Sequence, residues 1–264
     1  MAESTALIAP PSFAEWSAPA SWETIDFISD LHLSEETPRG FDAWAAYLRD
    51  SPADAVFILG DLFEAWVGDD ARHVGFEARC AAVLSEAAAT RPVAFMVGNR
   101  DFLVGDAMLS ACGVRALADP TVLVCGAHRL LLSHGDVLCL SDTEYQRVRR
   151  MARSSAWQEN FLALPLAERR AQVRQMRTQS ELHNKARAGT GYADLDLPTT
   201  MSWMRAAGAP IFIHGHTHKP ATEVLAPGLV RHVLSDWDLD HADPARAEVL
   251  RWRHGALTRL PLAP

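Results

Sequence analysis

Residues 24–33 read TIDFISDLHL, and two later stretches, DAVFILGDLF (54–63) and PVAFMVGNRD (92–101), have the same form. Each is a short run of apolar, mostly β-branched or aromatic residues that ends in a polar cluster. Such runs, bounded by Gly, Asn or Asp, predict buried β-strands. The sequences between them, FDAWAAYLRD (41–50) and FEARCAAVLSEAAAT (76–90), have helical spacing. This alternation of strands and helices predicts a largely parallel α/β sheet.

The second half of the chain has a different pattern. In VLVCGAHRLLL (122–132), Gly126 occupies a hairpin-like position between two apolar runs. Further strands are predicted in APIFIHGHTH (209–218), LVRHVLS (229–235) and EVLRWR (248–253). We therefore expect the strands of this half to be mostly antiparallel.

The chain divides into three parts by pattern. Residues 1–22 contain three prolines among Ser and Ala, which predicts an irregular N-terminal arm. Residues 23–264 then predict one domain. From about residue 142 to about residue 198 the apolar residues recur at helical spacing, with arginines at the remaining positions. We expect a helical insertion here that acts as a lid.

Composition excludes several classes of protein. The chain has 264 residues, of which 48% are hydrophobic and 22% charged, as in a globular protein. Its apolar runs are shorter than the roughly 18 residues that a membrane-spanning helix needs. No Lys or Arg precedes Arg39, so we expect no secretory signal and a cytoplasmic location. The cysteines have no C-x-x-C spacing and predict reduced core thiols: Cys80, Cys112, Cys125 and Cys139.

Polar side chains follow the predicted strands at five places. They occur in SDLH (29–32), GD (60–61), GNRD (98–101), SHGD (133–136) and IHGHTH (213–218). In open α/β sheets the carboxyl ends of the strands are where ligands bind, because the loops converge there. Carboxylate, imidazole and amide ligands together suit Mn, Fe, Zn or Ni better than Ca or a thiolate-bound metal. We therefore predict a dinuclear metal centre at this edge of the sheet.

The spacing within these clusters favours a shared site. Asp30 and His32 are two residues apart, as are His216 and His218, so each pair lies on one side of an extended chain. A single loop can then supply two ligands. Asp61 follows a predicted strand, and its carboxylate could bridge two cations because it has two oxygens.

The motifs DLHL, GDLFEAWVGDD, GNRDF, SHGD and HGHTH, in this order, resemble the calcineurin-like metallophosphoesterase superfamily over about residues 24–235. Arg100 stands where that superfamily usually has a His. With this Arg, GDLFEAWVGDD (60–70) and DTEYQ (142–146) are similar to the UDP-2,3-diacylglucosamine diphosphatase family of lipid A biosynthesis. The resemblance implies a mixed β-sheet sandwich flanked by helices, with the helical insertion holding the acyl chains. It also implies hydrolysis of the substrate's pyrophosphate bond to UMP and 2,3-diacylglucosamine 1-phosphate.

The resemblance also implies roles for particular residues and two divalent metal ions, expected to be Mn²⁺. The first metal would be held by Asp30, His32, Asp61 and His218, and the second by Asp61, Asn99, His134 and His216. Catalytic roles fall on Asn99, Arg100 and His134. Substrate contacts fall on Asn99, Arg100, Asp142, Ser180, Asn184, Arg187 and His216.

The chemistry of such a site can be stated from general principles. Two neighbouring cations lower the pKa of a water molecule and neutralise phosphoryl oxygens during in-line attack. Arg100 offers a planar, permanently charged group that can stabilise charge on the phosphate in the transition state. Asp136, two residues after His134, is predicted to orient a neighbouring imidazole rather than to bind metal directly.

The basic and apolar residues of the insertion predict a function for it. Residues 145–187 contain ten basic and three acidic residues, although the net charge of the chain is −8. Trp157, Phe161 and Leu162 lie among these arginines, which predicts a lid whose apolar side takes lipid chains and whose arginines meet anionic groups. We expect peripheral association with the cytoplasmic face of the inner membrane. The acidic net charge argues against nucleic acid as a partner.

Two other functions remain open. Another metallophosphoesterase, such as a phosphatase, a cyclic-nucleotide phosphodiesterase or a nuclease, would use the same metals on a soluble substrate. That alternative leaves the apolar, basic insertion without a purpose. A non-catalytic scaffold that retains the fold is the second alternative, but all seven metal-ligand positions are filled. A comparison of acylated and unacylated substrates separates these possibilities.

Overall fold

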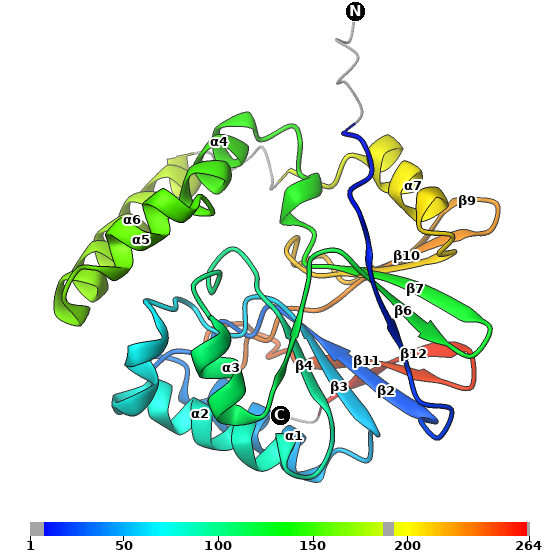
Figure 1. Cartoon of the computed structure of the whole chain (residues 1–264), viewed down its shortest axis with the longest axis horizontal. Helices are drawn as coiled ribbons and strands as arrows, with labels where there is room; N and C mark the ends of the chain where they lie inside the picture. The colour runs from blue at the N-terminus through cyan, green and yellow to red at the C-terminus, as the bar shows by residue number, and fades with distance from the viewer. Residues whose placement is uncertain (1–7, 187–192, 263–264) are drawn as a thin grey trace, which may run out of the picture.

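The computed structural model describes residues 8–186 and 193–262, with side chains described except at residues 178–186. Two six-stranded sheets are stacked on each other, and helices cover both outer faces (Figure 1). The predicted fold class, a mixed sheet sandwich flanked by helices, is confirmed. None of the helices within the described residues is long and apolar enough to cross a membrane.

The first sheet has the strand order β12-β11-β2-β3-β4-β5. Its strands β2 to β5 run parallel, as the alternation of strands and helices predicted, and β11 joins β2 in antiparallel pairing. Three helices, α1 to α3, pack on its outer face. The strands are β2 (Thr24–Ile28), β3 (Ala55–Leu59), β4 (Val93–Met96), β5 (Arg115–Leu117), β11 (Glu248–Arg253) and β12 (Ala256–Pro261). The helices are α1 (Pro38–Asp50), α2 (Gly75–Ala88) and α3 (Asp106–Cys112), with the short 3-10 helix η1 (Asp69–His73) before α2.

The second sheet has the order β1-β6-β7-β8-β10-β9, with α7 on its outer face. Its hairpins are antiparallel as expected, but β8 runs parallel to both of its neighbours, β7 and β10. The long connection between β7 and β8 allows these two strands to pair in parallel, because parallel neighbours require a crossover of this kind. These elements are β1 (Ala14–Ser17), β6 (Thr121–Cys125), β7 (His128–Ser133), β8 (Ile211–His214), β9 (Ala221–Ala226), β10 (Leu229–Val233) and α7 (Leu197–Ala206).

The N-terminal segment differs from the irregular arm expected over residues 1–22. Residues 14–17 form β1, which pairs in parallel with β6 at the edge of the second sheet. Trp16 packs between the sheets, with its ring 5.1 Å from that of Phe57 and the Arg115 guanidinium 3.8 Å from its ring centre. Apolar burial and a cation–π contact therefore hold this segment. Short edge strands of this kind carry little pattern of their own.

The core follows from strands that are apolar on both faces. In β3, Phe57 and Leu59 face the space between the two sheets, whereas Val56 and Ile58 face the helices. Side chains alternate between the faces of a strand, so a continuous apolar run predicts burial on both sides. All four cysteines are free and buried, which confirms the prediction of reduced core thiols.

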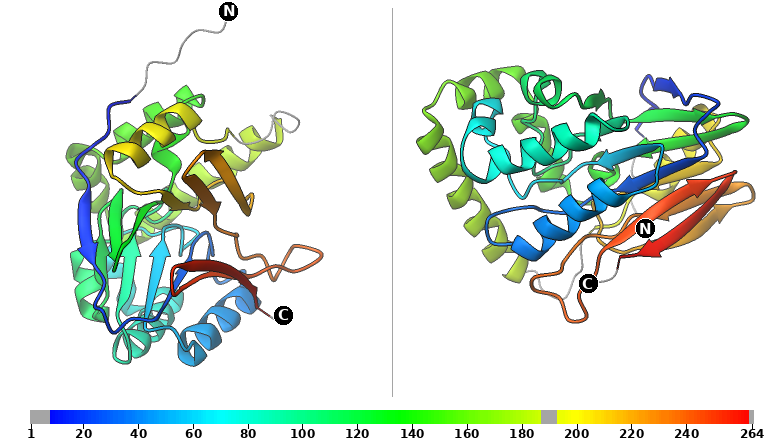
Figure 2. Two further views of the ribbon diagram at one scale, coloured as in Figure 1. Left: turned by 90° about the vertical axis from the view of Figure 1, so that its right-hand side faces the viewer. Right: turned by 90° about the horizontal axis from the view of Figure 1, so that it is seen from below.

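The insertion contains three helices, α4 (Thr143–Ala152), α5 (Ser155–Leu162) and α6 (Leu166–Ala186), here called the insertion helices. They follow β7 and the short 3-10 helix η2 (Asp136–Leu138). The Asp142 side chain caps α4 by accepting a hydrogen bond from the Tyr145 backbone N–H. Figures 1 and 2 show the insertion helices at one side of the molecule, away from the hairpin ends of the sheets. Their position is next to the loops that follow the strands of the first sheet.

Several charges of the insertion helices hold them to the domain. Four of their arginines pair with carboxylates outside these helices: Arg149 with Asp136, Arg169 with Asp70, Arg170 with Glu77 and Arg177 with Glu64. The Arg169 side chain is 4% exposed and also donates to the Val67 and Leu164 carbonyls. The sequence suggested that the arginines of the insertion meet anionic groups. Because these four arginines are already paired with carboxylates of the protein, not all of the arginines are available for that role.

One apolar residue of the insertion lies elsewhere than expected. Phe161 is 4% exposed and belongs to the same core cluster as the helices of the first sheet, so it does not lie on the exposed apolar side of the insertion. Trp157 stacks on it at 4.9 Å between ring centres and also contacts Phe102. Leu162, by contrast, is 42% exposed. A helix with apolar residues on adjacent positions can bury only part of them, and α5 buries Phe161.

Candidate metal centre

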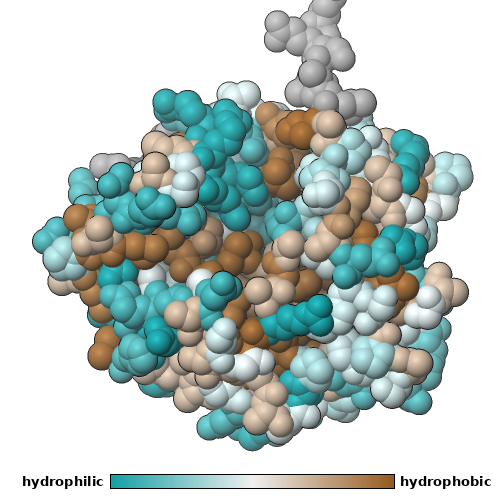
Figure 3. All heavy atoms as spheres, viewed as in Figure 1, coloured by the Kyte–Doolittle hydropathy of each residue, from teal (hydrophilic) through white to brown (hydrophobic). Residues whose placement is uncertain are grey.

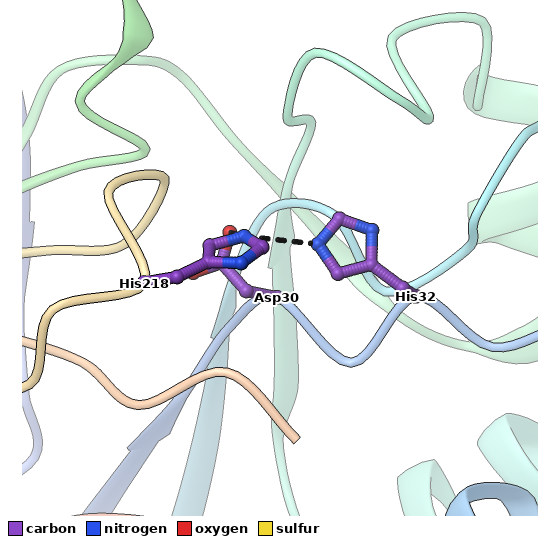
Figure 4. Close-up of side chains that lie close together, drawn as sticks. All are labelled: Asp30, His32 and His218. Atoms are coloured by element: carbon purple, nitrogen blue, oxygen red, sulfur yellow. Dashed lines mark hydrogen bonds and ion pairs between the residues drawn. The ribbon is translucent and has the colours of Figure 1, made fainter. Parts of the chain in front are cut away.

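Three of the predicted ligands meet where β2 and β8 end. Asp30 and His32 follow β2, and His218 lies in the loop after β8. The Nε2 atoms of the two histidines are 3.2 Å apart, and His218 Nε2 lies 3.5 Å from Asp30 Oδ1. Figure 4 shows the two rings facing each other beside the Asp30 carboxylate. Ligand atoms of all three residues lie within 4.8 Å of one another, which is close enough to share one cation.

A second group forms around Asn99, at the end of β4. Asn99 Oδ1 lies 2.9 Å from His134 Nε2 and 2.8 Å from His216 Nδ1. The other ring nitrogen of His134 lies 2.9 Å from the Leu59 carbonyl oxygen, which fixes the direction of the ring. An amide oxygen and two imidazole nitrogens thus converge at one point.

Asp61 lies between the two groups and faces both. Its Oδ2 atom is 4.0 Å from His32 Nε2, and its Oδ1 atom is 3.8 Å from His134 Nε2. The side chain is 2% exposed. One oxygen toward each group is the arrangement by which a carboxylate can serve two cations. The structure therefore brings together all seven residues that the sequence singled out for metal.

The backbone at these residues is strained. Asp30, His32, Asp61, His216 and His218 all have positive φ, between 49° and 69°. The left-handed region costs a non-glycine residue free energy, although Asp and His tolerate it better than most, and such strain concentrates at functional sites. Among the described non-glycine residues, the only other one with positive φ is His254. Five predicted ligands therefore share a conformation that turns their side chains into the site.

Asp101 holds two of the ligand loops together. Its buried carboxylate accepts hydrogen bonds from the backbone N–H groups of Gly98 at 2.7 Å and Leu62 at 2.8 Å. Burial, and then the nearby Asp61 charge, raise the pKa of Asp101 to about 7. A side chain at Gly98 would collide with the Asp61 carboxylate, so only glycine allows this approach. Asp101 thus fixes the loops after β3 and β4 and does not pair with Arg100.

The electrostatics of the cluster favour a bound cation. Burial disfavours the His134 imidazolium, but the charges of Asp61, Asp30 and Asp136 outweigh this and raise the pKa of His134 to about 9. For His216, burial and then the His134 charge lower the pKa to about 4. The buried carboxylates therefore make this cluster a site where positive charge is favoured. With donors of nitrogen and oxygen type, the residues fit two divalent metal ions.

Arg100 lies at the rim of this cluster. Its backbone N–H donates to Asp61 Oδ1 at 2.8 Å, and its guanidinium lies 3.3 Å from Glu64 Oε1. Glu64 was not singled out from the sequence, although it follows Asp61 by three residues. Its other oxygen lies 3.0 Å from His32 Nδ1, on the side of the ring that faces away from His218. The only signal for Glu64 in the sequence is its place in GDLFEAW.

Asp136 has a different role from the one predicted. It is fully buried, and it accepts hydrogen bonds from Tyr145 Oη at 2.8 Å and Arg149 Nε at 2.7 Å. It therefore anchors α4 and does not hold an imidazole directly. The Tyr145 ring lies 5.8 Å from that of His216, so α4 reaches the second ligand group.

A cavity of about 320 Å³ adjoins the first ligand group. The side chains that line it include His32, His218, Glu64, Arg177, Trp237 and Arg246. The described residues that were predicted to contact substrate do not line this cavity: Asn99, Arg100, Asp142 and His216. The side chains of Ser180 and Asn184, and the whole of Arg187, lie outside the part of the chain that the structure describes. The cavity gives a ligand access to the cluster from the side of α6.

Comparison with known proteins agrees with this geometry. Residues 23–220 match the calcineurin-like phosphoesterase family. The chain is 43% identical over 242 residues to the UDP-2,3-diacylglucosamine hydrolase of Chromobacterium violaceum, covering 90% of this chain and 98% of that protein. It is 41% identical over 247 residues to the protein of that name from Ralstonia nicotianae, covering 89% and 91%. For the one from Xanthomonas oryzae pv. oryzae, it is 40% identical over 222 residues, covering 80% and 90%. The chain belongs to the calcineurin-like phosphoesterase family.

Proposed function

We propose that this protein hydrolyses the pyrophosphate bond of UDP-2,3-diacylglucosamine. A water oxygen forms a bond to one phosphorus, the bridging P–O bond breaks, and the products are UMP and 2,3-diacylglucosamine 1-phosphate. Three relatives at 40–43% identity, each matched over most of its length, carry the name UDP-2,3-diacylglucosamine hydrolase. The observation that carries the chemistry is Asp61, which directs one oxygen to each of two ligand groups.

In this proposal the two ligand groups hold two divalent metal ions, and we propose Mn²⁺ as the metal. Asp30, His32 and His218 would hold the first ion, Asn99, His134 and His216 the second, and Asp61 both. When bound, such ions supply an activated water and neutralise charge on the phosphoryl group. The nitrogen and oxygen donors support Mn²⁺ but also suit its neighbours in the first transition row.

The other residues of the site act on the substrate. Arg100 is in position to bind a phosphoryl oxygen with its planar guanidinium. Asn99, His134 and His216 hold the region where the reacting phosphorus lies. Asp142 caps the start of α4, and we propose that Asp142, Ser180, Asn184 and Arg187 also contact the substrate.

We propose that the insertion, over about residues 142–198, is a lid for the acyl chains. Figure 3 shows hydrophobic surface gathered beneath the insertion helices. The exposed apolar residues of these helices support a contact with lipid: Val148, Met151, Leu162 and Met176, which are 40–51% exposed. Exposed arginines stand next to two of them on α4, Arg147 and Arg150. Such a surface suits peripheral binding to an anionic bilayer, which we propose to be the inner membrane's cytoplasmic face.

The rival function is hydrolysis of a soluble phosphodiester or phosphomonoester by the same metals. The test is UMP release from UDP-2,3-diacylglucosamine and from UDP-glucosamine without acyl chains, beside hydrolysis of a generic aryl phosphodiester. We expect kcat/KM to be at least about 100-fold higher with the acyl chains, because burying two of them adds several kcal/mol of binding. Equal values for the two UDP-sugars would favour the rival function.

A further inference from the structure

Glu64 is the one carboxylate that touches both the metal centre and the insertion helices among the residues whose side chains are described. Its Oε2 atom lies 3.0 Å from His32 Nδ1. Its Oε1 atom lies 3.3 Å from the Arg100 guanidinium and 2.8 Å from that of Arg177 on α6. The side chain is 14% exposed, so these contacts are shielded from water. Three groups from three segments therefore share one largely shielded anion.

The contact with His32 has a defined chemical consequence. His32 turns Nε2 toward His218 and Asp61, so Nδ1 is the nitrogen that carries the proton when Nε2 binds a cation. A carboxylate at Nδ1 fixes this tautomer and the ring direction, and it raises the basicity of the ligating nitrogen. His218 has a similar but longer contact on its outer nitrogen, with Nδ1 3.6 Å from Asp236.

The contacts with the arginines have a separate consequence. Arg100 and Arg177 are two cations directed to the same oxygen, and Glu64 offsets their repulsion. Without that charge the arginines would separate, and the guanidinium of Arg100 would lose its fixed direction. The position of α6, which carries Arg177, would then no longer be tied to the metal ligand His32.

We infer that Glu64 is a positioning residue that sets metal affinity through His32 and holds Arg100 and α6 in place for the reaction. It touches no reacting atom itself. The part of this inference that concerns turnover rests on the proposed function, whereas the part that concerns metal affinity does not. The simpler alternative is that the ion pair between Glu64 and Arg177 only attaches α6 to the domain.

The chain offers a matched control for that alternative. Glu77 on α2 pairs with Arg170 on α6 at 2.9 Å, and its side chain is similarly shielded at 19% exposure. It contacts none of the predicted metal ligands among its described partners. Glu77→Gln therefore breaks a comparable attachment of α6 without touching the metal centre, and Glu64→Gln breaks both.

The experiment measures Mn²⁺ dissociation constants of the two variants and the wild-type protein by competition with a chelator. Loss of an outer carboxylate partner typically weakens metal binding about 10- to 100-fold, so we expect at least about a 10-fold rise for Glu64→Gln. Glu77→Gln should stay within about twofold of wild type. Glu64→Asp, which keeps the charge on a shorter side chain, should recover part of the affinity. Thermal unfolding of each variant identifies any that does not fold, and Glu64→Asp then carries the test.

Turnover supplies the second readout. For Glu64→Gln, added Mn²⁺ should restore part of the lost kcat, and the remaining deficit reports the displaced Arg100. Unchanged Mn²⁺ affinity in folded Glu64→Gln, or an equal loss in Glu77→Gln, would overturn the inference. Failure of the proposed function is distinguishable, because it would appear as wild-type protein that binds two Mn²⁺ yet releases no UMP.

Discussion

Asn99 Oδ1 lies 2.8 Å from His216 Nδ1, and this contact joins the ends of β4 and β8, which belong to different sheets. The candidate metal centre therefore lies between the two sheets of the sandwich and not on either sheet alone. His134, from the end of β7, approaches the same amide oxygen at 2.9 Å. Because the predicted ligands come from both sheets, the geometry of the site depends on how the sheets are stacked.

Replacing Asp61 tests the bridging arrangement. Asp61→Ala should lower bound metal from about two ions to one or fewer and abolish hydrolysis, because its oxygens face both ligand groups. Metal analysis of the purified variant measures this. Asp50→Asn, at an exposed carboxylate on α1, serves as the control. Full metal occupancy with normal turnover in Asp61→Ala would contradict the assignment.

Arg100 should matter for turnover and not for metal content. Arg100→Ala should bind two metal ions yet lose about 100-fold or more in kcat, since one charge-assisted contact in the transition state contributes roughly 3 kcal/mol. Arg100→Lys should recover only part, because it lacks the bidentate geometry. Steady-state kinetics at saturating metal measure this, and a near-normal rate for the Ala variant would remove Arg100 from the mechanism.

Phe161 should behave as a core residue. Phe161→Ala should lower the free energy of unfolding by about 3–5 kcal/mol, the usual cost of a large-to-small change in a core, because the side chain is 4% exposed. Urea denaturation measures the loss. Met151→Ala, at a position that is 51% exposed, should change the free energy of unfolding by less than about 0.5 kcal/mol. Similar values for the two variants would mean that α5 is not packed as described.

His232 should contribute to acid sensitivity. Burial and then Arg259 lower its pKa from 6.5 to about 4, so the unfolded chain binds this proton more readily than the folded chain. Between about pH 6.5 and pH 4 the free energy of unfolding should therefore fall as pH falls. His232→Gln should show a shallower fall over this window in denaturant titrations at several pH values. Parallel curves for the two proteins would show that His232 is not shielded.

The sequence predicted the strands whose burial is complete and the polar side chains that come together at their ends. Runs such as residues 54–59 and 92–97 are apolar on both faces, and the loops after them carry Asp61 and Asn99. Other features depend on contacts between distant segments. Glu64 has its role through His32 and Arg177, which no spacing reveals, and Phe161 looks the same in sequence whether it faces lipid or the core.

The identity of the products tests the proposed reaction most directly. Mn²⁺-loaded protein is incubated with UDP-2,3-diacylglucosamine, and phosphorus NMR follows the two signals of the diphosphate, with a chelator-treated sample beside it. We expect both signals to be replaced by equal amounts of two phosphomonoesters, UMP and 2,3-diacylglucosamine 1-phosphate, only with metal present. An intact diphosphate, or release of inorganic phosphate or UDP in place of UMP, would contradict it.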